Sequence, residues 1–192
     1  METPEGVLLR YLQAQREALV WKLDGLGERD LRRPLTPTGT NLLGIVKHVA
    51  SVETGYLRAC FGLEQAFATP WFESDEPNAD MYATADETPA QVLGWYRSAW
   101  AADDAAVRKL GLDAVGSVPW WPPERREVSM HTLLVHVIAE TARHAGQCDI
   151  LREGIDGAVG YREGNGNLPS AEQAQWEAYV ARVQGIADTA PA

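Results

Sequence analysis

The 192-residue sequence predicts an all-α protein, a four-helix bundle followed by a short C-terminal helix. Four long segments repeat apolar residues with the period of an amphipathic helix, and no segment shows the alternation of a half-buried strand. The first and third connections between these segments are short and the second is long, which is typical of a bundle with one crossover. We therefore expect a single domain over residues 1–192, with its core over about 4–154.

Turn and cap residues mark the ends of the first two predicted helices. We expect the first helix over residues 4–26, where apolar residues recur with helical period before a pair of glycines. A connector rich in proline and glycine follows. The second helix is expected over residues 40–61, with Thr40 or Asn41 as its N-cap and Gly62 at its end.

The connection over about 63–87 has no sustained period. So long a connection is uncommon in a compact domain, and it usually crosses the fold or lines a site. The third helix is expected to begin at Thr88 and Pro89, a cap followed by proline at the first helical position, and to extend to about Leu110.

The fourth helix is expected over 129–153, after a loop rich in tryptophan and proline, with Gly154 at its end. Five glycines indicate a loop over 154–169, which either closes over a site or only links two helices. Ser170 is expected to cap a shorter fifth helix over 171–184, so that the C-terminal loop and helix together occupy about 155–185.

Composition restricts the classes of function. Hydrophobic residues make up 45% and charged residues 23% of the chain, as in ordinary globular proteins, and the net charge of −10 argues against a nucleic-acid surface. No apolar run is long enough to span a membrane, and the first residues lack the basic and apolar parts of a signal peptide. We expect a cytoplasmic protein without nucleic-acid or membrane partners, in which Cys60 and Cys148 are buried thiols.

The fourth predicted helix carries His136, Glu140 and His144 at intervals of four residues. Side chains at this spacing lie about 6 Å apart at Cβ, so Glu140 and His144 could share one divalent cation. On a helical wheel His144 points at the core, and Glu140 lies on the shoulder of the apolar stripe. A hydrogen-bonded core histidine, or a surface ladder of contacts, would explain the same spacing.

His48 lies within or beside the apolar stripe of the second predicted helix, so three ionisable side chains face one interior. A cation there would remove the cost of burying the charged carboxylate of Glu140. Two imidazoles and one carboxylate are a favoured set for catalytic zinc, which keeps a fourth position open. We interpret His136 as a contact at the rim of this site and Cys148 as a packed core thiol.

Four separated segments also carry a resemblance to a known family. They are NLLGIVKHVASVE over 41–53, WFESDEPNAD over 71–80, TPAQVLGWY over 88–96 and ETARHAGQ over 140–147. In order and spacing they resemble the DinB/YfiT-like superfamily, and within it the DUF664 group of mycothiol-transferase-like proteins. The resemblance covers nearly the whole chain.

The resemblance implies an up-down-down-up bundle with a divalent metal, zinc first and nickel second, held by three side chains, and often a homodimer. His48 and His144 match two ligand positions of the family. The third position is histidine in many relatives and Glu140 here, as in the His-Glu-His variant of some mycothiol-dependent relatives. The association of the founding member with DNA damage does not transfer as an activity.

A mechanism follows if the co-substrate is mycothiol or a similar low-molecular-weight thiol. A coordinating metal removes the thiol proton, and the resulting thiolate is the nucleophilic form of sulfur. We expect it to attack a small electrophile in a pocket between helices, with Glu140 as a ligand and not as a base. Candidates for the pocket wall, or simply for packing, are Trp71, Tyr96, Trp120 and Trp121.

Two alternatives stay open at this point. One is a metal-dependent hydrolase, in which the metal lowers the pKa of water toward about 7, with Glu53, Glu140 or His136 as the candidate base. The other is a non-catalytic, metal-binding stress-response bundle. It would be favoured if protein side chains filled every coordination position, because structural zinc sites are closed.

Overall fold

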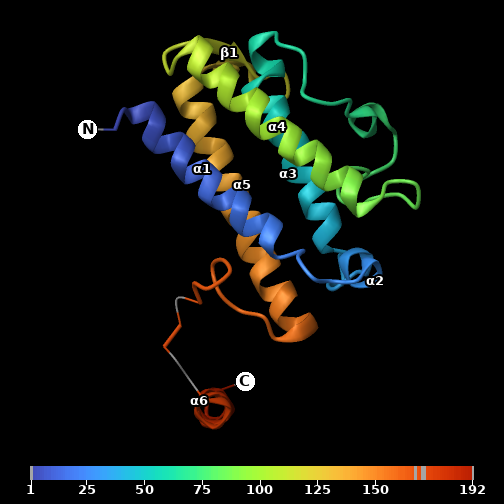
Figure 1. Cartoon of the computed structure of the whole chain (residues 1–192), viewed down its shortest axis with the longest axis vertical. Coiled ribbons are helices and arrows are strands. Elements are labelled where there is room, and N and C mark those ends of the chain that lie inside the picture. Colours follow the sequence, from blue (N-terminus) through green and yellow to red (C-terminus); the bar gives the residue numbers. More distant parts are fainter. Residues whose placement is uncertain (1, 167, 170–171, 192) are drawn as a thin grey trace.

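Four long helices pack side by side in the structure, a computed structural model that describes residues 2–166, 168–169 and 172–191 (Figure 1). α3 and α4 run parallel to each other, and α1 and α5 run in the opposite direction. This order is the predicted all-α, up-down-down-up bundle. The four helices are α1 (Pro4–Trp21), α3 (Leu42–Leu57), α4 (Pro89–Leu110) and α5 (Met130–Asp156).

α1 begins as predicted at Pro4, where the side chain of Thr3 accepts a hydrogen bond from the backbone of Gly6. It ends at Trp21, five residues before the predicted end. The reason is a turn that closes at Gly25, whose φ of 73° is in the left-handed region that glycine tolerates. A separate short helix, α2 (Glu28–Arg32), follows this turn.

Caps at both starts confirm the predicted beginnings of α3 and α4. The side chain of Asn41 accepts a hydrogen bond from Gly44, and α3 continues beyond its end at Leu57 as a short 3₁₀ helix, η1 (Ala59–Phe61). Thr88 and Gln91 form a capping box at the start of α4. This box fixes the point at which the long crossover ends.

The crossover over 63–87, which contains the 3₁₀ helix η2 (Pro70–Glu73), packs against α3. The buried ammonium of Lys47 donates to the backbone oxygens of Ala79 and Tyr82 and pairs with Glu87 at 2.8 Å. A Cβ added to Gly44 would lie 1.8 Å from the backbone oxygen of Met81, so only glycine permits this close approach.

The loop between α4 and α5 contains a small antiparallel hairpin that the sequence did not predict. β1 (Val115–Ser117) pairs with β2 (Glu127–Ser129), and the 3₁₀ helix η3 (Pro123–Arg125) lies between them. Strands of three residues are too short to show an alternating pattern. The hairpin holds the tryptophan-rich loop over the C-terminal end of α3, because β1 contacts η1.

α5 begins after the Ser129 cap, as predicted, and ends at Asp156, three residues beyond the predicted end. Gly157, with φ of 75°, takes the left-handed conformation that ends the helix, and Gly154 stays helical. The glycine-rich loop after it packs against α1, where Lys22 donates to the backbone oxygen of Gly160. It therefore links helices on that side of the bundle.

The last helix, α6 (Gln173–Asp188), begins two residues after the predicted start and ends four residues after the predicted end. The predicted cap, Ser170, and the predicted first helical residue, Ala171, lie outside the described residues. Figure 1 shows α6 apart from the four long helices, and none of its side chains is buried. No helix of the described residues is long and apolar enough to cross a membrane.

Candidate metal centre

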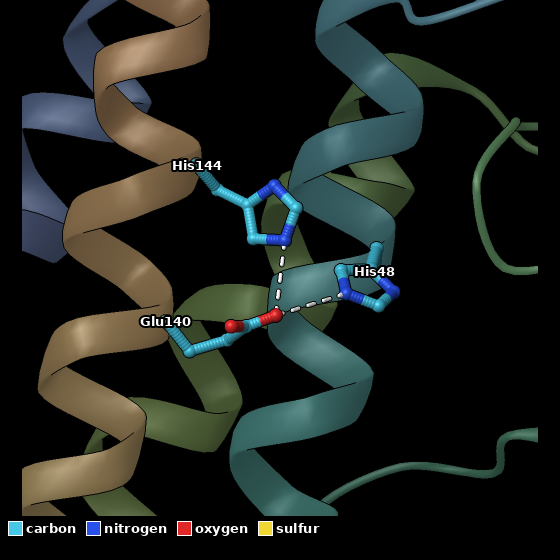
Figure 2. A group of neighbouring side chains, drawn as sticks. All are labelled: His48, Glu140 and His144. Carbon is cyan, nitrogen blue, oxygen red and sulfur yellow. Dashed lines mark hydrogen bonds and ion pairs between the residues drawn. The ribbon is translucent and has the colours of Figure 1, made fainter. Parts of the chain in front are cut away.

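Three side chains from two helices converge between α3 and α5 (Figure 2). One donor atom each from His48, Glu140 and His144 lies within 4.8 Å of the other two. Oε1 of Glu140 lies 3.1 Å from Nε2 of His144 and 3.6 Å from Nε2 of His48. The sequence predicted this convergence from the four-residue spacing on α5 and the apolar stripe of α3.

The crossover fixes the orientation of the His48 ring. Nδ1 of His48 donates to Oδ2 of Asp80 over 2.5 Å, and this hydrogen bond is the main cause that holds the pKa of Asp80 below its usual value. Asp80 precedes Met81, whose backbone passes against Gly44. The close approach at Gly44 therefore brings a carboxylate to the outer face of the ring and leaves Nε2 directed at Glu140.

Gln147, one turn along α5, orients His144 in the same way. Nδ1 of His144 donates to Oε1 of Gln147 over 2.8 Å, because a carbonyl oxygen can only accept. A neutral imidazole carries one ring proton, and the contacts with Asp80 and Gln147 favour the tautomer that has this proton on Nδ1. In that tautomer the Nε2 atoms of His48 and His144 present lone pairs to the shared point, whereas a proton on Nε2 of His144 would be donated to Oε1 of Glu140 over 3.1 Å.

This arrangement brings three hydrogen-bond acceptors together, because the carboxylate of Glu140 also has only lone pairs to offer. Acceptors at 3.1 and 3.6 Å repel one another unless a proton or a cation lies between them. Two nitrogen donors and one oxygen donor are a preferred set for zinc. The donor set thus fits a divalent cation, and the side chains stay 10–29% exposed, so the point is reachable from solvent.

His136 and Cys148 lie outside this group of three. The ring of His136 packs edge-on against Tyr56 and Trp121, with centroid separations of 4.8 and 5.4 Å. Cys148 is fully buried in an apolar cluster, and burial raises the pKa of its thiol far above the usual value. Burial also raises the pKa of Cys60 to about 11. Neither thiol is in the reactive thiolate form at neutral pH.

Two of the candidate functional residues are elsewhere in the fold. Glu53 is completely buried and pairs with Arg16, from which Oε1 accepts two hydrogen bonds, so its suggested role as a base at the site is wrong. Tyr96 is also completely buried in the core, which contradicts its suggested place in a pocket wall. Among the bases named for a hydrolase, only Glu140 belongs to the group of three.

The structure adds two residues that sequence reasoning did not assign, Asp80 and Gln147. Each accepts a hydrogen bond from a ring of the site. Gln147 lies three residues after His144, a helical spacing that could have suggested the contact. The only signal for Asp80 was the length of the crossover, because such a connection often lines a site.

Comparison with known families agrees with this geometry. The model of the mycothiol-S-transferase family matches residues 7–157, well over half of the chain, and includes all four long helices except the first residues of α1. No protein of the curated set matches the chain. The chain therefore belongs to the mycothiol-S-transferase family, and α6 lies outside the matched region.

Proposed function

We propose that this member of the mycothiol-S-transferase family joins a low-molecular-weight thiol to a small electrophile, with a divalent cation held by His48, Glu140 and His144. Mycothiol is the proposed thiol, and zinc is the proposed metal, with nickel as the alternative. The observation that carries the proposal is the convergence of one carboxylate oxygen with two ring nitrogens, from rings whose Nδ1 atoms contact Asp80 and Gln147 instead.

Each residue of the site has a defined task in this proposal. Zinc bound there would lower the pKa of a coordinating thiol, which supplies the thiolate at neutral pH. Glu140 offsets one positive charge, while Asp80 and Gln147 hold the two rings in the ligating tautomer. Within the described residues the group has three members, and three protein ligands leave a fourth position open, as catalytic zinc sites do.

The proposed reaction is a displacement at carbon. The thiol loses its proton to solvent on the exposed side of Glu140, and the sulfur electron pair forms a bond to the electrophilic carbon. The bond from that carbon to its leaving group breaks, and the leaving group departs with the bonding pair. The products are a thioether, a proton and the released anion, so charge and atoms balance. We place this reaction in the cytoplasm, where small thiols are kept reduced.

The proposal is tested by incubating zinc-loaded protein with chloroacetamide and mycothiol, bacillithiol or glutathione in parallel. Mass spectrometry should show enzyme-dependent conjugate with mycothiol, and His144→Ala should form it no faster than buffer. Elemental analysis of both proteins gives a readout that does not depend on activity. Absence of conjugate with all three thiols, despite bound zinc, would contradict the proposal. The predicted homodimer is checked separately by sedimentation.

A further inference from the structure

A pocket of about 380 Å³ opens on the stripe of α3 that begins at His48. Val52 and Tyr56 follow His48 at intervals of four residues, so all three lie on one face of the helix. This volume lies within the range of small-molecule sites. The lining consists of Ser51, Val52, Gly55, Tyr56, Ala59, Gln65, Phe72 and Trp120.

We propose that this apolar pocket binds the electrophile, and that it selects uncharged substrates with an elongated aromatic part. The inference rests on the proposed function, because it assigns a place and a chemical class to the second substrate. From His48 to Tyr56 the helix rises about 12 Å. A substrate that fills the pocket and reaches the metal centre therefore needs a length of about two aromatic rings.

Contacts from α5 place Tyr56 of the pocket and the metal centre along the same interface between α3 and α5. His136 lies one turn before Glu140, and its ring packs against Tyr56 at a centroid separation of 4.8 Å. At the other end of the same interface, the rings of His48 and His144 lie 4.9 Å apart. The two helices thus run antiparallel past each other, and the donors and the pocket occupy successive turns of one interface.

The polar groups of the lining leave little hydrogen-bonding capacity. The hydroxyl of Ser51 donates to the backbone oxygen of Lys47 and accepts from the indole of Trp71. The hydroxyl of Tyr56 accepts from the indoles of Trp120 and Trp121. Since no charged side chain lines the pocket, a charged ligand would lose hydration without compensation there.

Two donors remain available to a substrate. Gln65 also lines the pocket, and its Nε2 has no acceptor among the described residues, while its Oε1 accepts from Thr69. The Tyr56 hydroxyl accepts hydrogen bonds from two indoles, and no residue of the described chain accepts its own proton. That proton can be donated to a carbonyl or nitro group of a ligand. At the rim, Trp120 and Phe72 stay 59% and 51% exposed, so an aromatic ligand would remove costly apolar surface from water.

A second hollow, next to Gln147, is the reason for assigning the apolar pocket to the electrophile and not to the thiol. It has a volume of about 430 Å³, and its lining combines the polar Thr36, Thr40, Arg143 and Gln147, the residue that orients His144, with the apolar Ile150 and Leu151. Mycothiol carries two polyhydroxylated rings, which need hydrogen-bond partners of this kind. This hollow, which offers four polar side chains, therefore suits the thiol better than the apolar pocket does, and the apolar pocket is left for the electrophile.

Gly55 offers a direct test, because a Cβ added there meets only Nε2 of Gln65, at 4.0 Å. Gly55→Leu should fill the pocket with little strain on the helix. The matched control is Gly94→Leu on α4, where an added Cβ meets nothing within 4 Å and no pocket residue lies nearby. Trp120→Ala, which removes an exposed wall, is a second variant in case the first does not fold.

Two readouts separate this inference from the proposed function. The first is calorimetric binding of the unreactive N-biphenylylacetamide without thiol, which should be at least tenfold weaker in Gly55→Leu and Trp120→Ala and unchanged in Gly94→Leu. The second compares kcat/KM for chloroacetamide and its N-biphenylyl derivative, in each of which sulfur displaces chloride from carbon. Wild type should favour the larger substrate at least tenfold, and Gly55→Leu should reduce this ratio to about one.

The outcomes are distinct. Binding of the biphenylyl amide that Gly55→Leu abolishes, without conjugate formation, would support the pocket and contradict the proposed thiol transfer. No binding to wild type, or equal binding to wild type and both pocket variants, would overturn the pocket. Equal kcat/KM for the small and large substrates in wild type would also overturn it, even if the protein proves to be a thiol transferase.

Discussion

α3 carries two polar clusters that satisfy their charges in different ways. His48 meets Glu140 and His144 at a partly exposed point where three acceptors converge. Glu53, five residues later, is completely buried against Arg16, which also pairs with Asp104 at 2.9 Å. The first cluster lacks a positive charge that an added ion can supply. The second contains its own cation, and its Arg16 and Glu53 side chains are fully buried.

The second cluster also holds more carboxyl groups than its arginine can neutralise. Asp103 is fully buried, and neither of its oxygens nor Oε2 of Glu53 has a partner among the described residues. Burial raises the pKa of Asp103 well above its usual value and raises that of Glu53 as well. Burial therefore favours the protonated form of a carboxyl group in this cluster. The comparison teaches that a deficit of positive charge indicates a ligand site where solvent reaches it, whereas a buried deficit favours protonation of a carboxyl group.

The largest expected effect is on the second cluster. Arg16→Met leaves Glu53 buried without its partner, which should lower the free energy of unfolding by about 3–5 kcal/mol. Urea denaturation measures this loss. Arg10→Met, which breaks an exposed pair with Glu2, is the control and should leave the unfolding midpoint unchanged. Equal effects of the two substitutions would show that burial does not distinguish these ion pairs.

Zinc should stabilise the open cluster by mass action. At a free zinc concentration a hundredfold above Kd, the free energy of unfolding should rise by about 2.7 kcal/mol in wild type. His144→Ala, which removes one of three donors, should lose most of this gain. The readout is denaturation with zinc and with a chelator. A zinc-dependent gain of the same size in the variant would place the bound ion elsewhere.

The contact from the crossover to His48 should tune metal affinity. Asp80→Asn keeps the size of the side chain but weakens the acceptor for Nδ1, so zinc affinity should fall about 10- to 100-fold. Competition with a chromogenic chelator gives the dissociation constant. Asp75→Asn, an exposed change in the same crossover, is the matched control. If both variants bind zinc equally well, Asp80 does not support the ligand.

The last expected effect is a pH dependence of stability from Asp103. Its folded pKa is raised, so the native state holds a proton that the unfolded state releases above about pH 4. Stability should therefore fall as pH rises from about 4 through the folded pKa, by up to about 1.4 kcal/mol per pH unit. Asp103→Asn should flatten this slope, and exposed Asp113→Asn should not. Urea denaturation at several pH values in this range measures the slope of stability against pH. An unchanged slope in Asp103→Asn would show that another group causes the pH dependence.

The sequence predicted the parts of the fold and site that depend on helical periodicity. Glu140 and His144 lie one turn apart on α5, and His48 lies beside the apolar stripe of α3, so their convergence follows from local pattern. The position of Asp80 does not follow from local pattern. It depends on the crossover, which has no helical periodicity and passes closely over Gly44.

The burial of Glu53 against Arg16 could not be predicted from the sequence either. A helical wheel places it on α3 but does not show that Arg16 of α1 reaches the same point in the core. The strands of the hairpin were missed because three residues are too few to show alternation, and β1 pairs with β2 and contacts η1. Long-range contacts thus decided each feature that local pattern could not predict.

Calorimetric zinc titration of chelator-treated protein, with elemental analysis of the product, tests the metal centre most directly. We expect one zinc ion per chain in wild type and no tight binding in His48→Ala or His144→Ala, because each variant keeps only two of the three converging donors. Failure of wild type to bind zinc or nickel, or one tightly bound ion in both variants, would contradict the assignment of His48, Glu140 and His144 as the ligands.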